Sequence, residues 1–193
     1  MTEVKRELVE KLRSEIEACD ACGLCETVKN RVIGEGDLDS RVVFVGEAPG
    51  RREDESGRPF MGSAGKLLDF ILAKAGLVRG DIFISNVVMC RPPENRKPKK
   101  EEIRPCSAHI EKLLAIIEPK VVAPMGKSAV DYVFERFGLA KGVIGDVHGK
   151  AVAAKASWGE LVIFPLYHPA AAIYNRKLLG ELEADMVNLA KLL

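Results

Sequence analysis

Five cysteines are the most reactive residues in this chain, and their spacing indicates metal chemistry. Cys19, Cys22 and Cys25 are each two residues apart, and Cys90 and Cys106 follow much later. Four thiolates can bind a zinc ion or an iron–sulfur cluster. Because the second pair spans a proline-rich loop, the spacing favours a bulky [4Fe–4S] cluster over zinc, and free buried thiols are a third alternative. One of the first three cysteines is then spare, and spacing alone does not say which.

Three polar residues stand at the ends of apolar, strand-like runs. These residues are Glu47, Asn86 and His168. Because the carboxyl ends of parallel strands meet at one edge of a sheet, we expect the three side chains to converge there. An amide can read the edge of a planar base, and a histidine can donate to an oxygen on which charge develops. The ordinary alternatives are a satisfied core amide for Asn86 and a helix cap for His168, which precedes Pro169.

The stretch from Arg41 to Phe60 connects this edge to the next helix. It begins with an unbroken apolar run, which is typical of a strand buried on both faces. The loop that follows contains Gly46, Pro49 and Gly50, so its backbone can approach a ligand closely. The aromatic ring of Phe60 can supply a stacking face, although a core position is the ordinary alternative.

A nucleotide-binding phosphate loop is excluded. Gly65-Lys66 resembles the end of that motif, but Phe60 and Leu67 stand where the motif requires Gly and Ser or Thr. We therefore expect no nucleotide hydrolysis, although Ser63 at a helix start can meet a backbone phosphate.

Basic residues gather in short groups, chiefly in the proline-containing segment 91–100. Solvated surface is the usual explanation for such runs. Prolines hold this segment in an ordered, exposed loop near the same sheet edge, which suits contacts with nucleic-acid phosphates.

The elements that must position these residues alternate between helix and strand. Such alternation predicts an α/β fold with a parallel sheet covered by helices on both faces. In the first helix, Val4, Leu8, Leu12 and Ile16 recur at i+4, and we expect this stripe to pack in the core. A glycine-bearing loop leads from Cys25 to the first strand. The expected helices are 2–18, 63–76, one that has Pro105 and Cys106 near its start and runs to 118, one ending at 137, and 178–193. The expected strands are 42–46, 82–88, 121–126 and 161–166, with an accessory strand within 147–158.

Length and composition indicate one globular domain, residues 1–193. The chain is 47% hydrophobic and 30% charged, with a net charge of +1, so any binding to nucleic acid must come from local patches. No apolar run approaches the ~18 residues that a membrane span requires, and the charged N-terminus has no signal-peptide pattern. We therefore expect a cytoplasmic protein with no membrane association, and a monomer. The absence of glutamine and the abundance of Glu, Lys and Arg fit a thermophilic source.

Four sequence motifs resemble those of the family 4 uracil-DNA glycosylases, the thermostable iron–sulfur type. They are GEAPG (46–50), GRPFMGSAGKLL (57–68), ISNVVMCRPPENRKP (84–98) and HPA (168–170). The resemblance extends from Cys19 to about Arg176. It implies a three-layer α/β/α sandwich with a central four-stranded parallel sheet, acting on uracil-containing DNA in base-excision repair.

The resemblance also implies roles for individual residues. Cys19, Cys22, Cys90 and Cys106 would hold a structural [4Fe–4S] cluster, which leaves Cys25 as the extra thiol.

At the reaction site the resemblance implies that Phe60 stacks on a flipped uracil, Asn86 reads its O4/N3 edge and His168 donates to O2. The segment 171–174 would approach the minor groove, and His148 would contact a phosphate.

The resemblance does not identify the group that activates the attacking water. Ala48 stands where the better-known glycosylases have an aspartate. The water could be positioned by Glu47, by Glu53 or by the backbone, and Glu53 is alternatively the group that excludes the methyl of thymine. No catalytic lysine is suggested, so we expect no lyase activity.

Three other functions remain as alternatives. They are a glycosylase for hypoxanthine or xanthine, a non-enzymatic iron–sulfur DNA-binding module, and an electron carrier. The combination of Phe60 and Asn86 favours uracil, and the set of Glu47, Asn86 and His168 favours an enzyme.

Overall fold

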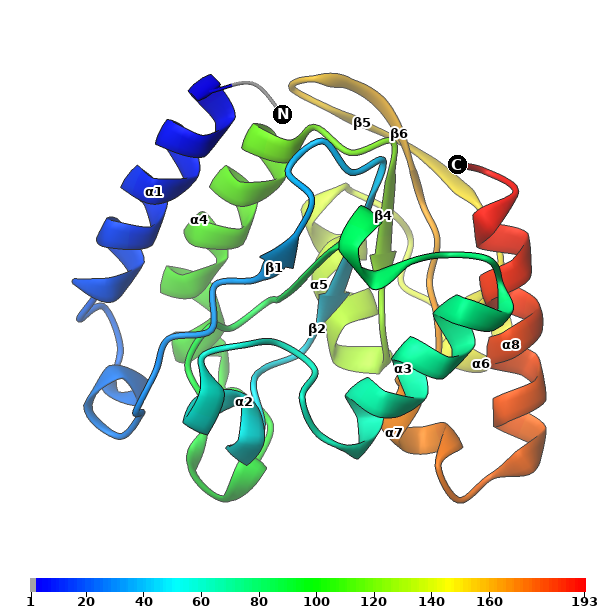
Figure 1. Cartoon of the computed structure of the whole chain (residues 1–193), viewed down its shortest axis with the longest axis horizontal. Coiled ribbons are helices and arrows are strands. Elements are labelled where there is room, and N and C mark those ends of the chain that lie inside the picture. Colours follow the sequence, from blue (N-terminus) through cyan, green and yellow to red (C-terminus); the bar gives the residue numbers. More distant parts are fainter. Residues whose placement is uncertain (1–2) are drawn as a thin grey trace.

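The computed structural model describes residues 3–193 and contains one mixed sheet of six strands (Figure 1). The order across the sheet is β1-β3-β2-β4-β6-β5. The four inner strands run parallel and the two outer strands are antiparallel to their neighbours. The strands are β1 (Glu35–Gly36), β2 (Val42–Gly46), β3 (Phe83–Asn86), β4 (Val121–Pro124), β5 (Val152–Ala156) and β6 (Gly159–Ile163).

The four-stranded parallel core confirms the fold expected from the sequence. β2 lies at its centre, where Val43 pairs with Phe83 of β3 on one side and with Val122 of β4 on the other. The accessory strand predicted within 147–158 is β5, and it is preceded by a short helix. β1 lies in the segment for which the sequence predicted only a loop.

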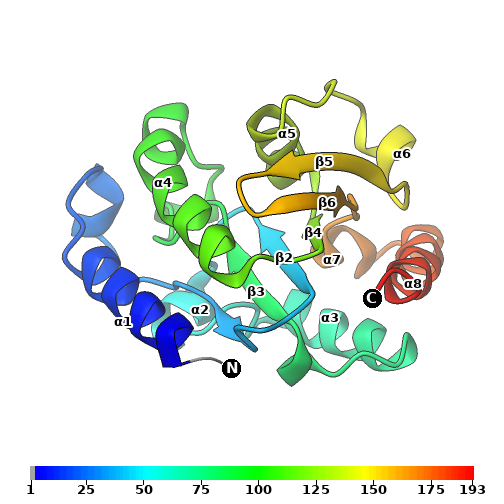
Figure 2. The ribbon, with the colours of Figure 1, turned by 90° about the horizontal axis from the view of Figure 1, so that it is seen from above.

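Helices cover both faces of this sheet (Figure 2). Alternate residues of β2 point to opposite sides: Val43 and Val45 pack with α1, α4 and α5, whereas Val42 and Phe44 pack with α3 and α8. This alternation explains why the strand is apolar throughout. The helices are α1 (Glu3–Glu17), α2 (Arg51–Ser56), α3 (Ser63–Lys74), α4 (Lys100–Ile117), α5 (Lys127–Arg136), α6 (Ile144–Val147), α7 (Pro169–Ala172) and α8 (Arg176–Ala190), and the single-turn 3₁₀ helices are η1 (Gly23–Glu26), η2 (Arg79–Asp81) and η3 (Pro93–Asn95).

The predicted core stripe of α1 was wrong in its first half. Val4 is 63% exposed and Leu8 is 45% exposed. A strict i+4 repeat drifts around a helix of 3.6 residues per turn, so it cannot stay on one face. The buried apolar stripe is Val9, Leu12 and Ile16.

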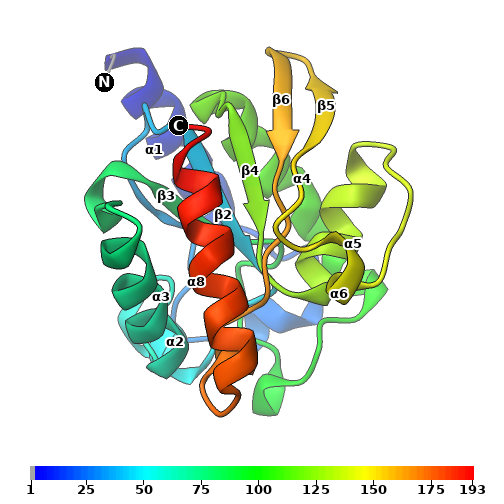
Figure 3. The same cartoon turned by 90° about the vertical axis from the view of Figure 1, so that its right-hand side faces the viewer.

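The carboxyl ends of the parallel strands gather at one edge of the molecule, at the bottom of Figures 1 and 3. α2 follows β2 there, and α7 follows β6. The connections after these strands therefore surround a common space. Among residues 3–193, no helix is long and apolar enough to cross a bilayer.

Candidate functional site

A cleft of about 730 Å³ opens at the carboxyl ends of β2, β3, β4 and β6. All six residues that the sequence predicted for the reaction site line it: Glu47, Ala48, Glu53, Phe60, Asn86 and His168. The expected convergence of strand-end side chains is therefore observed.

Phe60 has a left-handed backbone conformation, with φ of 53°. Such a conformation costs a bulky residue about 1–3 kcal/mol, so the surroundings must enforce it. Gly65 makes room for it, because a Cβ atom at Gly65 would lie 1.6 Å from the Phe60 carbonyl oxygen. A Cβ at Gly46 would likewise lie 2.9 Å from the Phe60 ring. Two glycines therefore allow the ring to lie against the end of β2.

Asn86 is the last residue of β3 and is 2% exposed. Its amide lies beside the end of β2, since a Cβ at Gly46 would come within 2.3 Å of the Asn86 Oδ1 atom. Among residues 3–193, no group forms a hydrogen bond with this side-chain amide. It is thus a nearly buried polar group that faces the cleft without a partner, and the satisfied core amide is not what is observed.

His168 caps α7 and also faces the cleft. Its Nδ1 atom accepts a hydrogen bond from the Ala170 backbone N–H at 3.1 Å. In a neutral imidazole the other nitrogen, Nε2, then carries the proton. Burial lowers the pKa of His168, which favours this neutral form, although the nearby carboxylates of Glu47 and Glu53 oppose the shift. His168 therefore caps α7 and faces the cleft at the same time. The ring centroid lies 5.7 Å from that of Phe60.

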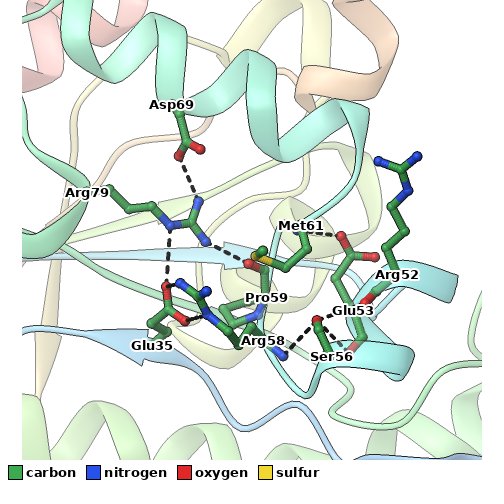
Figure 4. A network of polar contacts seen from close by, with 9 residues as sticks. All are labelled: Glu35, Arg52, Glu53, Ser56, Arg58, Pro59, Met61, Asp69 and Arg79. Carbon is green, nitrogen blue, oxygen red and sulfur yellow. Dashed lines mark hydrogen bonds and ion pairs between the residues drawn. The ribbon is translucent and has the colours of Figure 1, made fainter.

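The two glutamates at the cleft differ in their hydrogen bonding. The Glu53 carboxylate accepts from three backbone N–H groups, those of Gly50 at 3.1 Å, Met61 at 2.6 Å and Gly62 at 2.8 Å. Figure 4 shows the bond from Met61. No group among residues 3–193 donates a hydrogen bond to the carboxylate of Glu47, which is half-buried. Glu53 is thus held by the loop that carries Phe60, whereas Glu47 is free to orient a water or a ligand.

The rim of the cleft carries basic side chains. The expected loop contributes Arg96 and Lys97, and α2 contributes Arg51 and Arg52. Sequence reasoning missed the segment 125–128, which follows β4 and adds Lys127 and Ser128 to the lining. The strand-end argument, applied to β4 as it was to the other three strands, would have identified it.

His148 does not line this cleft. Its Nδ1 atom lies 2.6 Å from the Asp185 carboxylate of α8, and its ring packs against Tyr167. In this structure the ring therefore ties the segment after α6 to α8.

All five cysteines line a second, small cavity between α1, α4 and the segment after β3. All five are free thiols, and Cys90 and Cys106 are each 9% exposed. Burial raises the pKa of Cys90 to about 12 and that of Cys106 to about 11, and the thiols of Cys19 and Cys22 add to both shifts.

Two polar atoms at this cavity fit an iron–sulfur cluster. Arg31 Nε and His109 Nδ1 are buried without a hydrogen-bond partner among the described residues, and both side chains line the cavity. Buried polar atoms of this kind normally find a partner, and the sulfur atoms of a cluster accept hydrogen bonds from N–H groups. Within residues 3–193, no three His, Cys, Asp or Glu side chains are arranged to bind a single metal ion.

Comparisons with known proteins agree with the geometry. The family model described as "Uracil DNA glycosylase superfamily" matches residues 33–190. The Type-4 uracil-DNA glycosylase of Sulfurisphaera tokodaii is 42% identical, over 95% of this chain and 84% of that protein. Proteins of the same name from Archaeoglobus fulgidus and Saccharolobus solfataricus are 41% and 39% identical, over 96% and 90% of this chain and 94% and 81% of theirs.

Proposed function

Because the chain belongs to the uracil DNA glycosylase superfamily, we propose that it is a type-4 uracil-DNA glycosylase, which releases uracil from DNA and leaves an abasic site. The observation that carries this proposal is the unpartnered amide of Asn86. Its side-chain atoms face the cleft and are not sealed from it, so they are available to a matching ligand edge. Uracil offers such an edge, because its N3–H donates to Oδ1 and its O4 accepts from the amide NH₂.

The base must leave the helix stack to reach this amide. Flipping a nucleotide costs a few kcal/mol. Stacking on the Phe60 ring contributes about 1–3 kcal/mol in return. Cytosine presents an amine where uracil presents O4, so it would leave buried groups unpaired and can be rejected by about 10⁴-fold.

Cleavage of the N-glycosidic bond moves electrons onto the uracil and leaves the sugar electron-deficient. His168 Nε2–H donates to uracil O2, where negative charge develops. A positioned donor of this kind can stabilise the transition state by about 3–4 kcal/mol. Glu47 orients the water that attacks the sugar at C1′. Glu53 holds the loop of Phe60 and borders the C5 side of the base.

The reaction is monofunctional in this proposal. Lys97 and Lys127 line the cleft, but Lys127 is paired with Asp131 and Lys97 lies on the exposed loop at the rim. Neither is therefore assigned as a nucleophile at the sugar. The abasic strand stays intact until it is treated with alkali.

Cys19, Cys22, Cys90 and Cys106 would hold a [4Fe–4S] cluster, with Cys25 outside the set. When bound, the cluster supplies a cross-link between the segment after α1 and the loop between β3 and α4, and it takes no part in the reaction. The shared cavity of these thiols and the unpartnered polar atoms of Arg31 and His109 beside it support the presence of a cluster, and the resemblance supports the choice of the four ligands.

DNA would lie along the basic rim. Arg51, Arg52 and Lys97 would meet phosphates, and Tyr174, which is 97% exposed after α7, would enter the minor groove beside the flipped base. The protein would act as a monomer on single- or double-stranded DNA.

A panel of oligonucleotides tests the proposal. Each carries one uracil, hypoxanthine, xanthine, thymine or cytosine at the same position, and released base and strand breaks are measured separately. We expect release from the uracil strand alone, with breaks only after alkali. Preferential release of hypoxanthine or xanthine would mean that the enzyme acts on that base instead of uracil. Release of no base would reject the proposed activity.

A further inference from the structure

The carbonyl that precedes Phe60 is held by a side chain from outside the cleft. Arg79 of η2 donates a hydrogen bond from Nη2 to the Pro59 carbonyl oxygen at 2.6 Å (Figure 4). Arg79 does not line the cleft and comes from the turn between α3 and β3. It therefore holds the carbonyl of the residue before Phe60 from outside the cleft.

The guanidinium of Arg79 is itself fixed by two carboxylates. Its Nη1 atom donates to Asp69 of α3 at 2.8 Å, and its Nε atom donates to Glu35 of β1 at 3.4 Å. The Arg79 side chain is only 22% exposed. All three nitrogens of a planar, rigid group are thus engaged, so the position of the Pro59 carbonyl is tied to α3 and β1.

The backbone that follows Phe60 is held as well, because Glu53 accepts from the N–H groups of Met61 and Gly62. Fixing the peptide plane before Phe60 defines one end of its φ rotation, and fixing the plane after it defines one end of its ψ rotation. These two anchors enclose the residue whose φ is 53°. Removal of either anchor lets the backbone relax out of the left-handed conformation, which would tilt the ring away from the cleft.

We propose that Arg79 is a positioning residue for the base-stacking ring: it holds Phe60 in its left-handed conformation through the Pro59 carbonyl and thereby sets the affinity of the cleft for uracil. This inference rests on the proposed role of Phe60 as the stacking face. Arg79 touches neither the base nor the reacting atoms, so its effect on the reaction is indirect.

Arg58 provides a matched control. It donates two hydrogen bonds to the same Glu35 carboxylate, at 2.5 Å and 3.0 Å, and no hydrogen bond from its side chain to Pro59 is present among the described residues. Replacing either arginine with methionine removes one positive charge and part of the same ion-pair network. Only Arg79→Met removes the bond to the backbone of the stacking loop.

The experiment measures inhibition by free uracil and the steady-state constants on a uracil-containing oligonucleotide. We expect Arg79→Met to raise the inhibition constant of uracil and KM by about tenfold, as expected for loss of one charge-assisted hydrogen bond, while Arg58→Met changes them less than about twofold. Equal effects of the two substitutions would overturn the inference. Melting temperatures of both variants establish that they are folded.

A double-mutant cycle with Phe60→Ala distinguishes a positioning effect from a general one. If Arg79 acts through the ring, Arg79→Met has no further effect on uracil inhibition in the Phe60→Ala background. Independent, additive effects would overturn the inference. If Phe60→Ala alone leaves inhibition unchanged, the proposed role of Phe60 fails, and the inference fails with it.

Asp69→Asn is the second variant, for the case that Arg79→Met does not fold. The Asp69 side chain is 48% exposed and its loss frees one end of the Arg79 guanidinium. We expect a smaller rise in the inhibition constant, of about two- to fivefold. If the inhibition constant of uracil does not rise in the Asp69→Asn variant, the inference is contradicted.

Discussion

Asn86 is the residue at which the geometry and the proposed function agree most closely. Its side chain is 2% exposed, faces the cleft and has no hydrogen-bond partner within residues 3–193. Its amide is therefore available to bind a ligand. Its neighbours differ in this respect, since Glu53 is satisfied by three backbone donors and His168 Nδ1 is satisfied by one.

Asn86→Asp should change the base preference. A carboxylate has no donor for uracil O4, whereas it can accept from the exocyclic amine of cytosine. We expect the ratio of uracil to cytosine release, measured on matched oligonucleotides, to fall by about 10³-fold or more. An unchanged ratio would mean that another group reads this edge of the base.

The pH dependence of the reaction should reflect a neutral His168. Burial lowers the pKa of this imidazole below its ordinary 6.5, so the neutral form persists as the pH falls through that value. We expect kcat/KM on single-stranded substrate to stay level from pH 8 to about 6.5 and to decline only at lower pH. In the folded protein NMR should find the ring neutral at pH 7 with its proton on Nε2. A ring that is charged at pH 7 would contradict the neutral form and the hydrogen bond that Nδ1 accepts from Ala170.

Glu47→Gln and Glu53→Gln form a matched pair of substitutions. Glu47 has no hydrogen-bond donor among the described residues, so its amide variant should keep the melting temperature while kcat falls by about 10²-fold. Glu53 accepts from three backbone N–H groups, so its variant should lose about 1–3 kcal/mol of stability and bind uracil more weakly. Thermal unfolding and single-turnover kinetics measure both. If the two variants lose kcat equally and neither loses stability, Glu53 would instead be assigned as a water-positioning residue.

At the scale of elements, the site is a consequence of where strands end. β2, β3, β4 and β6 run parallel, so the residues that follow them face one cleft. The loop between β3 and α4 serves two sites, because Cys90 lies at its start and Arg96 and Lys97 lie at the rim of the cleft. Arg96 is already held by two hydrogen bonds to Glu102, at 2.8 Å and 2.6 Å.

Substitution of single cysteines tests the cluster assignment. Cys25→Ser should retain the visible absorbance and the full iron content, whereas Cys19→Ser should lose both and unfold at a lower temperature. The two residues lie in the same segment after α1, so each is a control for the other. A colourless wild-type protein that binds stoichiometric zinc would reject the cluster altogether.

The sequence was sufficient to predict the parallel core and the converging side chains, because apolar runs and their polar ends are local patterns. It was not sufficient for β1, which has two residues and no periodicity, or for the exposed positions of Val4 and Leu8. The hydrogen bonds of Glu53 also could not be predicted. Two of their donors are the backbone N–H groups of Met61 and Gly62, which follow the left-handed conformation of Phe60.

For the whole molecule, the net charge of +1 conceals a basic rim around the cleft. Both core clusters pack on the same six-stranded sheet, one on each face, and we propose on this ground that the chain acts as one domain. The cluster would brace one side of that domain, at the segment after α1 and the start of α4. The polar residues that line the cleft would carry out the reaction.

A crystal structure with free uracil bound tests the proposed recognition of the base most directly. We expect uracil stacked on the Phe60 ring, with its N3–H and O4 atoms at the Asn86 amide and its O2 atom at His168 Nε2. Binding outside the cleft, or binding with a different edge toward Asn86, would contradict it.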